Sequence, residues 1–248
     1  MGDDYDPRPV LAAAAGGAEG AWDFIRWFAE RWATPLTPDD GWPAGELRQH
    51  ASRLGIRLPA AVHAAYALFG RRDDLVRAQD RLLRPAQWET DASGSVLIVR
   101  VENQYTVEWG VPVSRDADAS GDPADADPPM WFRATDEDEW RPFLDRFSLG
   151  CVEMVLSDRL LAPDGPTDNR HLDAPTSTAL TERFTPLPLA PYPVWAVPDG
   201  PPVRWFTGDG VLLRADGTDW LWARARDTGA LDAVRSALPG EWLLGGDH

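Results

Sequence analysis

The sequence has one cysteine, no lysine and four histidines among its 248 residues. A single cysteine, Cys151, excludes an internal disulfide and a zinc site built from several cysteines, and it suits a reducing compartment. The histidines form no metal-binding or catalytic motif; they are His50, His63, His171 and His248. We therefore expect no metal site and no cofactor, and we expect Cys151 to be a core residue.

Long hydrophobic runs and a basic leader are also missing. No apolar stretch approaches the roughly 18 residues that a membrane helix needs. The sequence starts Met-Gly-Asp-Asp-Tyr-Asp, which is acidic where a secretory signal is basic. We therefore expect a cytoplasmic protein that has no membrane partner. With 44% hydrophobic residues, the chain is able to bury a large core.

Basic residues are scarce beside acidic ones. Forty acidic residues face 24 basic residues, all of them arginine, so the formal net charge is -16. Such a charge repels nucleic acid and attracts cationic partners. We predict that nine clustered acids bind a basic protein partner; the alternative is a solvated loop without a function. These acids are Asp116, Asp118, Asp122, Asp125, Asp127, Asp136, Glu137, Asp138 and Glu139.

Part of this acidic segment matches a calcium-binding loop. Asp116, Asp118 and Gly121 occupy the first, third and sixth positions of the template, and Asp127 occupies the twelfth. Pro123 stands where an aliphatic residue is usual, and an aspartate replaces the bidentate glutamate. We therefore favour partner binding over calcium binding for this loop.

Catalytic motifs are not found in the sequence. It contains no dinucleotide-binding glycine motif, no phosphate-binding loop and no nucleophile elbow. The acidic clusters lie in polar segments, where carboxyl pKa values are not raised for acid catalysis. We therefore predict no catalytic residues and a protein that is not an enzyme.

Hydrophobic periodicity predicts both helices and strands along the chain. We expect a C-terminal β-meander plus helix, and a single domain over residues 1–248. The loop-rich connection is expected at 161–193, because that segment is rich in proline and lacks a sustained period. Helices are expected at 21–32, 46–54, 59–69, from Trp140 to Val155 with an interruption at Gly150, and at 228–238; strands are expected at 96–101, 105–111, 128–133, 202–207, 211–215 and 219–225.

Four segments occur in an order that resembles one protein family. They are LGIRLPAAVHAAYALFG, VLIVRVENQYTVEWGVP, DPPMWF and WRPFLDRF. Together, over about residues 44–157, they resemble the SUKH superfamily, which unites fungal cell-wall-synthesis regulators with bacterial toxin-immunity proteins. Tyr105 stands where the family usually has a glycine after Glu-Asn-Gln. The residues that fill the family's positions are Glu102, Asn103, Gln104, Trp109, Pro128, Pro129, Trp140 and Leu144.

The resemblance implies an α+β fold, with a central, mainly antiparallel sheet flanked by helices and without an active site. It also implies an immunity protein, which binds and neutralises a cognate toxin such as a nuclease or a deaminase. A nuclease carries a basic cleft that neutralises phosphates, so clustered carboxylates are suited to occupy it. The alternative function is that of a regulatory scaffold protein that binds several endogenous partners.

Overall fold

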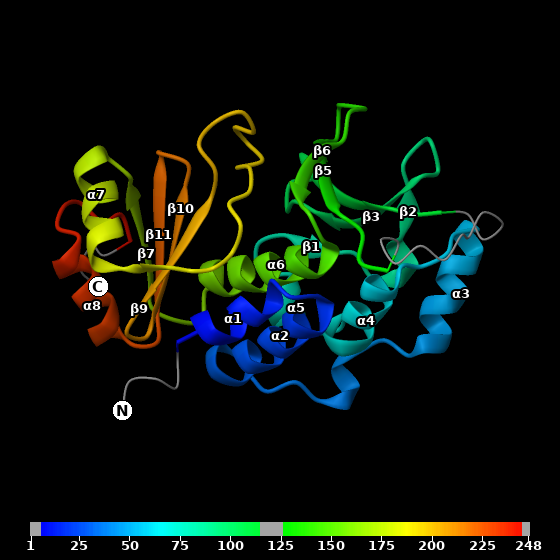
Figure 1. Cartoon of the computed structure of the whole chain (residues 1–248), viewed down its shortest axis with the longest axis horizontal. Helices are drawn as coiled ribbons and strands as arrows, with labels where there is room; N and C mark the ends of the chain where they lie inside the picture. The colour runs from blue at the N-terminus through cyan, green and yellow to red at the C-terminus, as the bar shows by residue number, and fades with distance from the viewer. Residues whose placement is uncertain (1–5, 115–125, 245–248) are drawn as a thin grey trace. The chain divides into compact units, whose positions relative to one another are not determined.

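The protein is described by a computed structural model that covers residues 6–114 and 126–244 (Figure 1). Helices and two antiparallel sheets confirm the α+β class. The chain divides into two compact units, one of residues 16–159 and one that combines residues up to Ala15 with those from Leu160 onward. Each unit has its own sheet, so the meander does not join the first sheet; that residues 1–248 behave as one domain stays a prediction. No helix in the covered ranges has the length and apolar character to cross a bilayer.

The unit of residues 16–159, called the first unit below, is built on a six-stranded antiparallel sheet. The strand order is β1-β3-β4-β5-β6, and β2 pairs with β3 beside β1. The predicted hairpin of 96–101 and 105–111 is confirmed as β3 and β4, which pair in antiparallel register. The strands are β1 (Arg81–Leu82), β2 (Glu89–Thr90), β3 (Val96–Val101), β4 (Val107–Pro112), β5 (Met130–Ala134) and β6 (Arg141–Leu144).

The three helices predicted at the start of the chain are confirmed. In α2, the residues Trp22, Ile25 and Phe28 recur at helical spacing and are all buried, as an amphipathic helix requires. Helix α3 ends at Gly55, which takes the left-handed conformation (φ 65°) that favours glycine. The helices of this unit are α2 (Ala18–Trp32), η2 (Pro38–Asp40), α3 (Ala44–Leu54), α4 (Ala60–Phe69), α5 (Asp73–Val76), η3 (Pro85–Gln87) and α6 (Phe147–Leu161), whose last residues belong to the other unit.

Helix α4 is joined to the segment between β1 and β2 through the buried side chain of Tyr66. Its hydroxyl donates to the carbonyl of Leu83 at 2.7 Å and accepts from the indole N–H of Trp88 at 2.9 Å. The Tyr66 and Trp88 rings also meet edge to face at 4.8 Å. The hydroxyl is therefore satisfied inside the core, and burial raises its pKa well above the usual value.

The helix predicted from Trp140 to Val155 is wrong in its first part. Residues 141–144 form strand β6, which pairs with β5, and the helix begins only at Phe147. Trp140, Phe143 and Phe147 follow helical spacing by coincidence, and Pro142 suits an edge strand because it has no N–H to pair. The acidic residues before Trp140 therefore precede a strand and do not stabilise a helix N-terminus.

The predicted interruption of this helix at Gly150 is also wrong. Helix α6 continues through Gly150, where the missing side chain leaves room for the Met130 side chain of β5. A Cβ atom at this position would lie 2.2 Å from the sulfur of Met130 on β5. The missing side chain thus lets α6 approach the sheet closely.

The other unit, called the second unit below, has a five-stranded antiparallel sheet in the order β7-β11-β10-β9-β8. The predicted meander is confirmed as β9, β10 and β11, and the last predicted helix as α8. Leu231 and Val234 of α8 and Leu180 of α7 pack on one face of the sheet to form a hydrophobic core. The elements are α1 (Arg8–Ala14), β7 (Thr167–His171), α7 (Ala174–Arg183), β8 (Thr185–Pro186), β9 (Arg204–Gly208), β10 (Val211–Asp216), β11 (Trp220–Ala225) and α8 (Thr228–Ala237).

The loop predicted at 161–193 is wrong, because this segment contains β7, α7 and β8. Strand β7 shows no apolar alternation since it buries polar side chains whose partners lie far along the chain. Asp168 pairs with Arg235 at 2.6 Å, and Arg170 donates to the carbonyl of Leu238 at 2.8 Å. Helix α7 begins after Asp173, whose carboxylate accepts from a backbone N–H of the first turn.

Two glycines near the start of α3 provide a stability test of the packing. A Cβ atom on Gly41 would lie 1.7 Å from the carbonyl oxygen of Ala67 on α4, whereas Gly45 has open space around it. We expect Gly41→Ala to lower the free energy of unfolding by about 2 to 3 kcal/mol, because backbone must move. Gly45→Ala is the matched control and should be neutral or stabilising by up to about 1 kcal/mol. Urea unfolding measures both, and equal stability of the two variants would contradict the close approach of α4.

Candidate functional site

Two turns lie side by side at one end of the first sheet. Strands β4 and β5 pair with Val107 opposite Ala134, so the turn before β4 meets the turn after β5. Thr135 joins them, because its backbone N–H donates to the carbonyl of Thr106 at 3.0 Å and its hydroxyl to that of Tyr105 at 2.9 Å. The connection from β5 to β6 projects from the sheet away from α2 and α4 (Figure 1). We call the exposed residues 104–106 and 135–139 the two-turn surface.

The first of these turns is held by Glu102, which is 4% exposed. Its carboxylate accepts the backbone N–H of Gln104 at 2.8 Å and the hydroxyl of Thr106 at 2.9 Å. The carbonyl of Glu102 also accepts the N–H of Tyr105 at 2.9 Å. The Glu-Asn-Gln segment therefore fixes the shape of the turn, with its glutamate turned inward.

Tyr105 combines an exposed ring with an uncommon backbone conformation. It has φ 61°, and it is the only non-glycine residue with positive φ in the ranges that the structure covers. The side chain is 54% exposed, and Arg81 donates to its hydroxyl at 3.1 Å. The guanidinium of Arg81 also lies 5.4 Å from the ring centroid. A bulky residue in the left-handed region lowers the stability of the folded chain by roughly 1 to 2 kcal/mol. Tyr105 therefore adopts a backbone conformation that favours glycine, and the fold is less stable for it.

Four of the predicted partner-binding residues belong to the two-turn surface. Asp136, Glu137, Asp138 and Glu139 are all exposed and directly follow the threonine that binds the Tyr105 carbonyl. Arg133, which precedes them, is engaged elsewhere: it pairs with Glu108 at 2.6 Å and stacks on Trp140. The surface is therefore strongly negative and carries one exposed aromatic ring.

Asp127 lies at the other end of β5, next to the start of α6. Its carboxylate accepts the backbone N–H of Ser148 at 2.9 Å and the hydroxyl of Ser148 at 2.7 Å. A carboxylate in this position stabilises the positive N-terminal end of the helix. The structure thus separates Asp127 from the acids of the two-turn surface and gives it hydrogen bonds within the chain.

The remaining predicted residues, Asp116, Asp118, Asp122 and Asp125, lie outside the described residues. The first positions of the calcium-loop match lie there too. Across residues 6–114 and 126–244, no group of three or more His, Cys, Asp or Glu side chains is placed to hold a metal ion.

The first unit also contains a buried cluster of charged groups. Arg100 on β3 is 2% exposed and pairs with Asp80 at 2.5 Å and with Glu153 of α6 at 2.7 Å. Its guanidinium lies 4.5 Å from the ring centroid of Trp109. The two carboxylates raise the pKa of Arg100, so the guanidinium stays charged although it is buried. The cluster thereby joins strand β3, helix α6 and the segment before β1.

Asp158 is a third carboxylate near the same guanidinium. It is fully buried, and its two oxygens accept the backbone N–H groups of Ala78 at 3.3 Å and Gln79 at 3.2 Å. Burial raises the pKa of Asp158 to about 7, with Asp80 adding to the rise, while Arg100 and the two N–H groups oppose it. Asp158 is thus enclosed in the core and hydrogen-bonded to the segment before β1.

The titration of Asp158 predicts how stability depends on pH. The folded pKa of about 7 lies above the usual value of 3.8, so this carboxyl stabilises the folded chain fully below pH 3.8 and loses that contribution as pH rises to about 7. The free energy of unfolding should fall by up to about 1.4 kcal/mol per pH unit from this group. Urea unfolding at several pH values checks this. Asp158→Asn should have a smaller slope between pH 5 and pH 7, and an unchanged slope would contradict the assignment.

Cys151 is a core residue, as the sequence predicted. Its side chain is 1% exposed, and it lies in α6. Burial raises the pKa of the Cys151 thiol well above its usual value. Because the thiolate is the reactive form, this cysteine is not suited to be a nucleophile.

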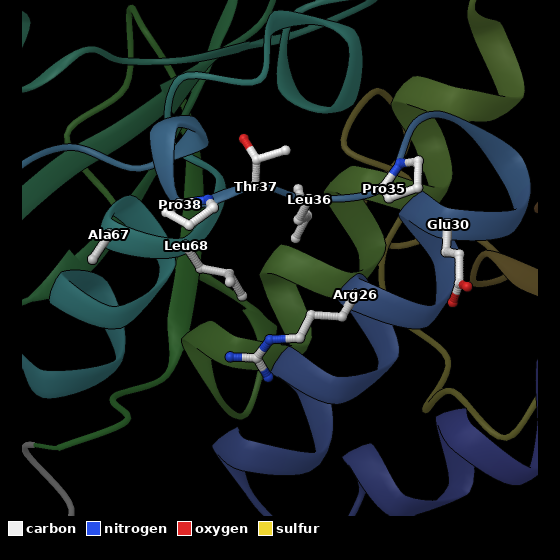
Figure 2. A pocket seen from close by; sticks show the side chains of 8 residues that line it. All are labelled: Arg26, Glu30, Pro35, Leu36, Thr37, Pro38, Ala67 and Leu68. Atoms are coloured by element: carbon white, nitrogen blue, oxygen red, sulfur yellow. The ribbon is translucent and has the colours of Figure 1, made fainter.

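A shallow pocket of about 390 Å³ lies between α2 and α4 (Figure 2). Leu36 and Leu68 are among its apolar lining residues, and the guanidinium of Arg26 is paired with Asp23 at 2.9 Å. The lining includes no cysteine, histidine or serine; its one hydroxyl is that of Thr37, and the carboxylate of Glu30 pairs with Arg31 at 2.9 Å. The pocket is lined by Arg26, Glu30, Pro35, Leu36, Thr37, Pro38, Ala67 and Leu68.

Comparison with known proteins finds no family model, no curated protein and no solved structure that matches the chain. The SUKH resemblance therefore rests on the four sequence segments alone. The strongest candidate for a functional site is the two-turn surface, because there the fold brings together exposed charge and an exposed aromatic side chain.

Proposed function

We propose that this chain is a noncatalytic protein-binding module of the cytoplasm, an immunity protein that binds and neutralises a basic toxin such as a nuclease or a deaminase. The observation that carries the proposal is the two-turn surface, where Asp136, Glu137, Asp138 and Glu139 are exposed next to a hydrogen-bonded turn. The net charge of -16 attracts the same class of partner over a longer range.

Electrostatics sets what such a surface contributes to binding. A nuclease binds phosphates through a basic cleft, and exposed carboxylates complement that cleft. Since the four acids lie at the surface, they act chiefly on the association rate, and salt screens their effect. Contacts that resist salt have to come from other side chains of the interface.

The order of elements is compatible with the SUKH resemblance. Helix α4 follows the Leu-Pro pair, the turn fixed by Glu102 joins β3 to β4, and β5 follows Pro128 and Pro129. Helix α6 then closes the first unit. This order supports the proposal but is shared by many α+β arrangements, so the test has to be functional.

The first experiment captures the partner. The full chain, carrying an affinity tag, is isolated from the cells that encode it, and bound proteins are identified. We expect one basic protein that is toxic when expressed alone and harmless when the chain is co-expressed. Several endogenous partners without toxicity would instead indicate a regulatory scaffold, and the absence of any protected toxin would overturn the immunity proposal.

Charge variants then test the surface. Replacing Asp136, Glu137, Asp138 and Glu139 by their amides should slow association with the captured partner about tenfold at low salt and have less effect at high salt. The control replaces four exposed acids outside the surface and should change the rate much less. These control residues are Asp39, Glu89, Glu182 and Asp219. Stopped-flow or surface-based kinetics measures both, and equal rates for the two variants would remove the two-turn surface from the interface.

A further inference from the structure

We propose that Tyr105 is the anchor of the partner interface and that its ring receives an arginine or lysine side chain of the partner. This inference rests on the proposed function. It goes beyond that function by naming the contact residue and the chemical group that it takes.

The first argument is the conformation of Tyr105. Its φ of 61° lies in the left-handed region, where glycine fits without strain and a tyrosine does not. Two hydrogen bonds restrict the backbone conformation of Tyr105, because its N–H donates to the Glu102 carbonyl and its own carbonyl accepts from the Thr135 hydroxyl. An aromatic side chain is thus presented at a position where glycine would serve the fold better.

The second argument is exposure. The Tyr105 side chain is 54% exposed, so its ring contributes far less to the core than a buried aromatic such as Trp109, which is 1% exposed. Strain that burial does not offset is typical of sites that serve binding. Tyrosine is also enriched among the residues that dominate binding energy in protein interfaces.

The third argument concerns the group that the ring would bind. Arg81 holds the hydroxyl at 3.1 Å and lies near the ring, which fixes the orientation of the side chain before any partner arrives. Arg81 occupies one cation position at the ring, so a cation of the partner has to approach the ring from another side. The exposed acids 136–139 follow Thr135, which binds the Tyr105 carbonyl, so they add negative charge to the surface around this turn and favour the approach of a cation. A basic side chain therefore suits the surroundings of the Tyr105 ring better than an apolar or acidic side chain does.

The test separates stability from binding. Tyr105→Gly should leave the melting temperature unchanged or higher, because glycine suits φ 61°, yet it should weaken binding of the captured partner about tenfold or more. Val197→Ala, which removes part of another exposed apolar side chain (51% exposed), should change neither quantity. Unchanged affinity for Tyr105→Gly would overturn the inference while leaving the proposed function intact. A clear loss of stability would overturn it too, since the ring would then serve the fold.

A second measurement does not depend on the partner. The full chain is titrated with N-acetyl-argininamide and, as the control, with N-acetyl-norleucinamide, and the Tyr105 ring signals are followed by NMR. We expect the ring and the amides of residues 136–139 to shift with the arginine compound alone, and the shifts to disappear in Tyr105→Gly. Equal shifts with both compounds, or none with either, would overturn the inference even if a toxin partner is found.

Discussion

The buried guanidinium of Arg100 holds separate segments of the first unit together. It joins β3 to α6 through Glu153 and to the segment before β1 through Asp80, so three parts of the chain meet at one charge. Removal of a partner from such a pair leaves an uncompensated buried charge, which is strongly destabilising. A buried ion pair is weak evidence for net stability, so its effect here is described by the segments that it joins. Here it fixes the position of α6 over the sheet that carries the two-turn surface.

That fixed sheet explains how a small polar surface keeps a defined shape. The buried carboxylate of Glu102 accepts the backbone N–H of Gln104 within the first turn, and Thr135 hydrogen-bonds this turn to the turn after β5. The exposed acids and the Tyr105 ring are therefore supported by backbone hydrogen bonds rather than by a core of their own. A partner that binds there meets a surface that is largely ordered beforehand, which lowers the entropic cost of association.

Sequence periodicity predicts those elements that bury one apolar face, and it fails where polar groups are buried. The stripe of α2 and the hairpin of β3 and β4 were predictable because apolar residues recur at the right spacing. Strand β7 was missed because Asp168 and Arg170 find partners about 70 residues away, which no local pattern reveals. Strand β6 was mistaken for a helix because Trp140, Phe143 and Phe147 imitate helical spacing. For the candidate site, the sequence predicted the acids and noted the tyrosine in place of glycine, but only pairing of β4 with β5 brings Tyr105 and residues 136–139 together.

Strand β5 stands between Asp127 and the acids of the two-turn surface. Its five residues span about 17 Å in an extended conformation. This length exceeds the reach of any single side chain, so one arginine cannot bridge the two acidic positions. A partner that contacted both Asp127 and the two-turn surface would need basic groups spaced along the whole strand. A partner with one small basic region would contact only one of the two positions.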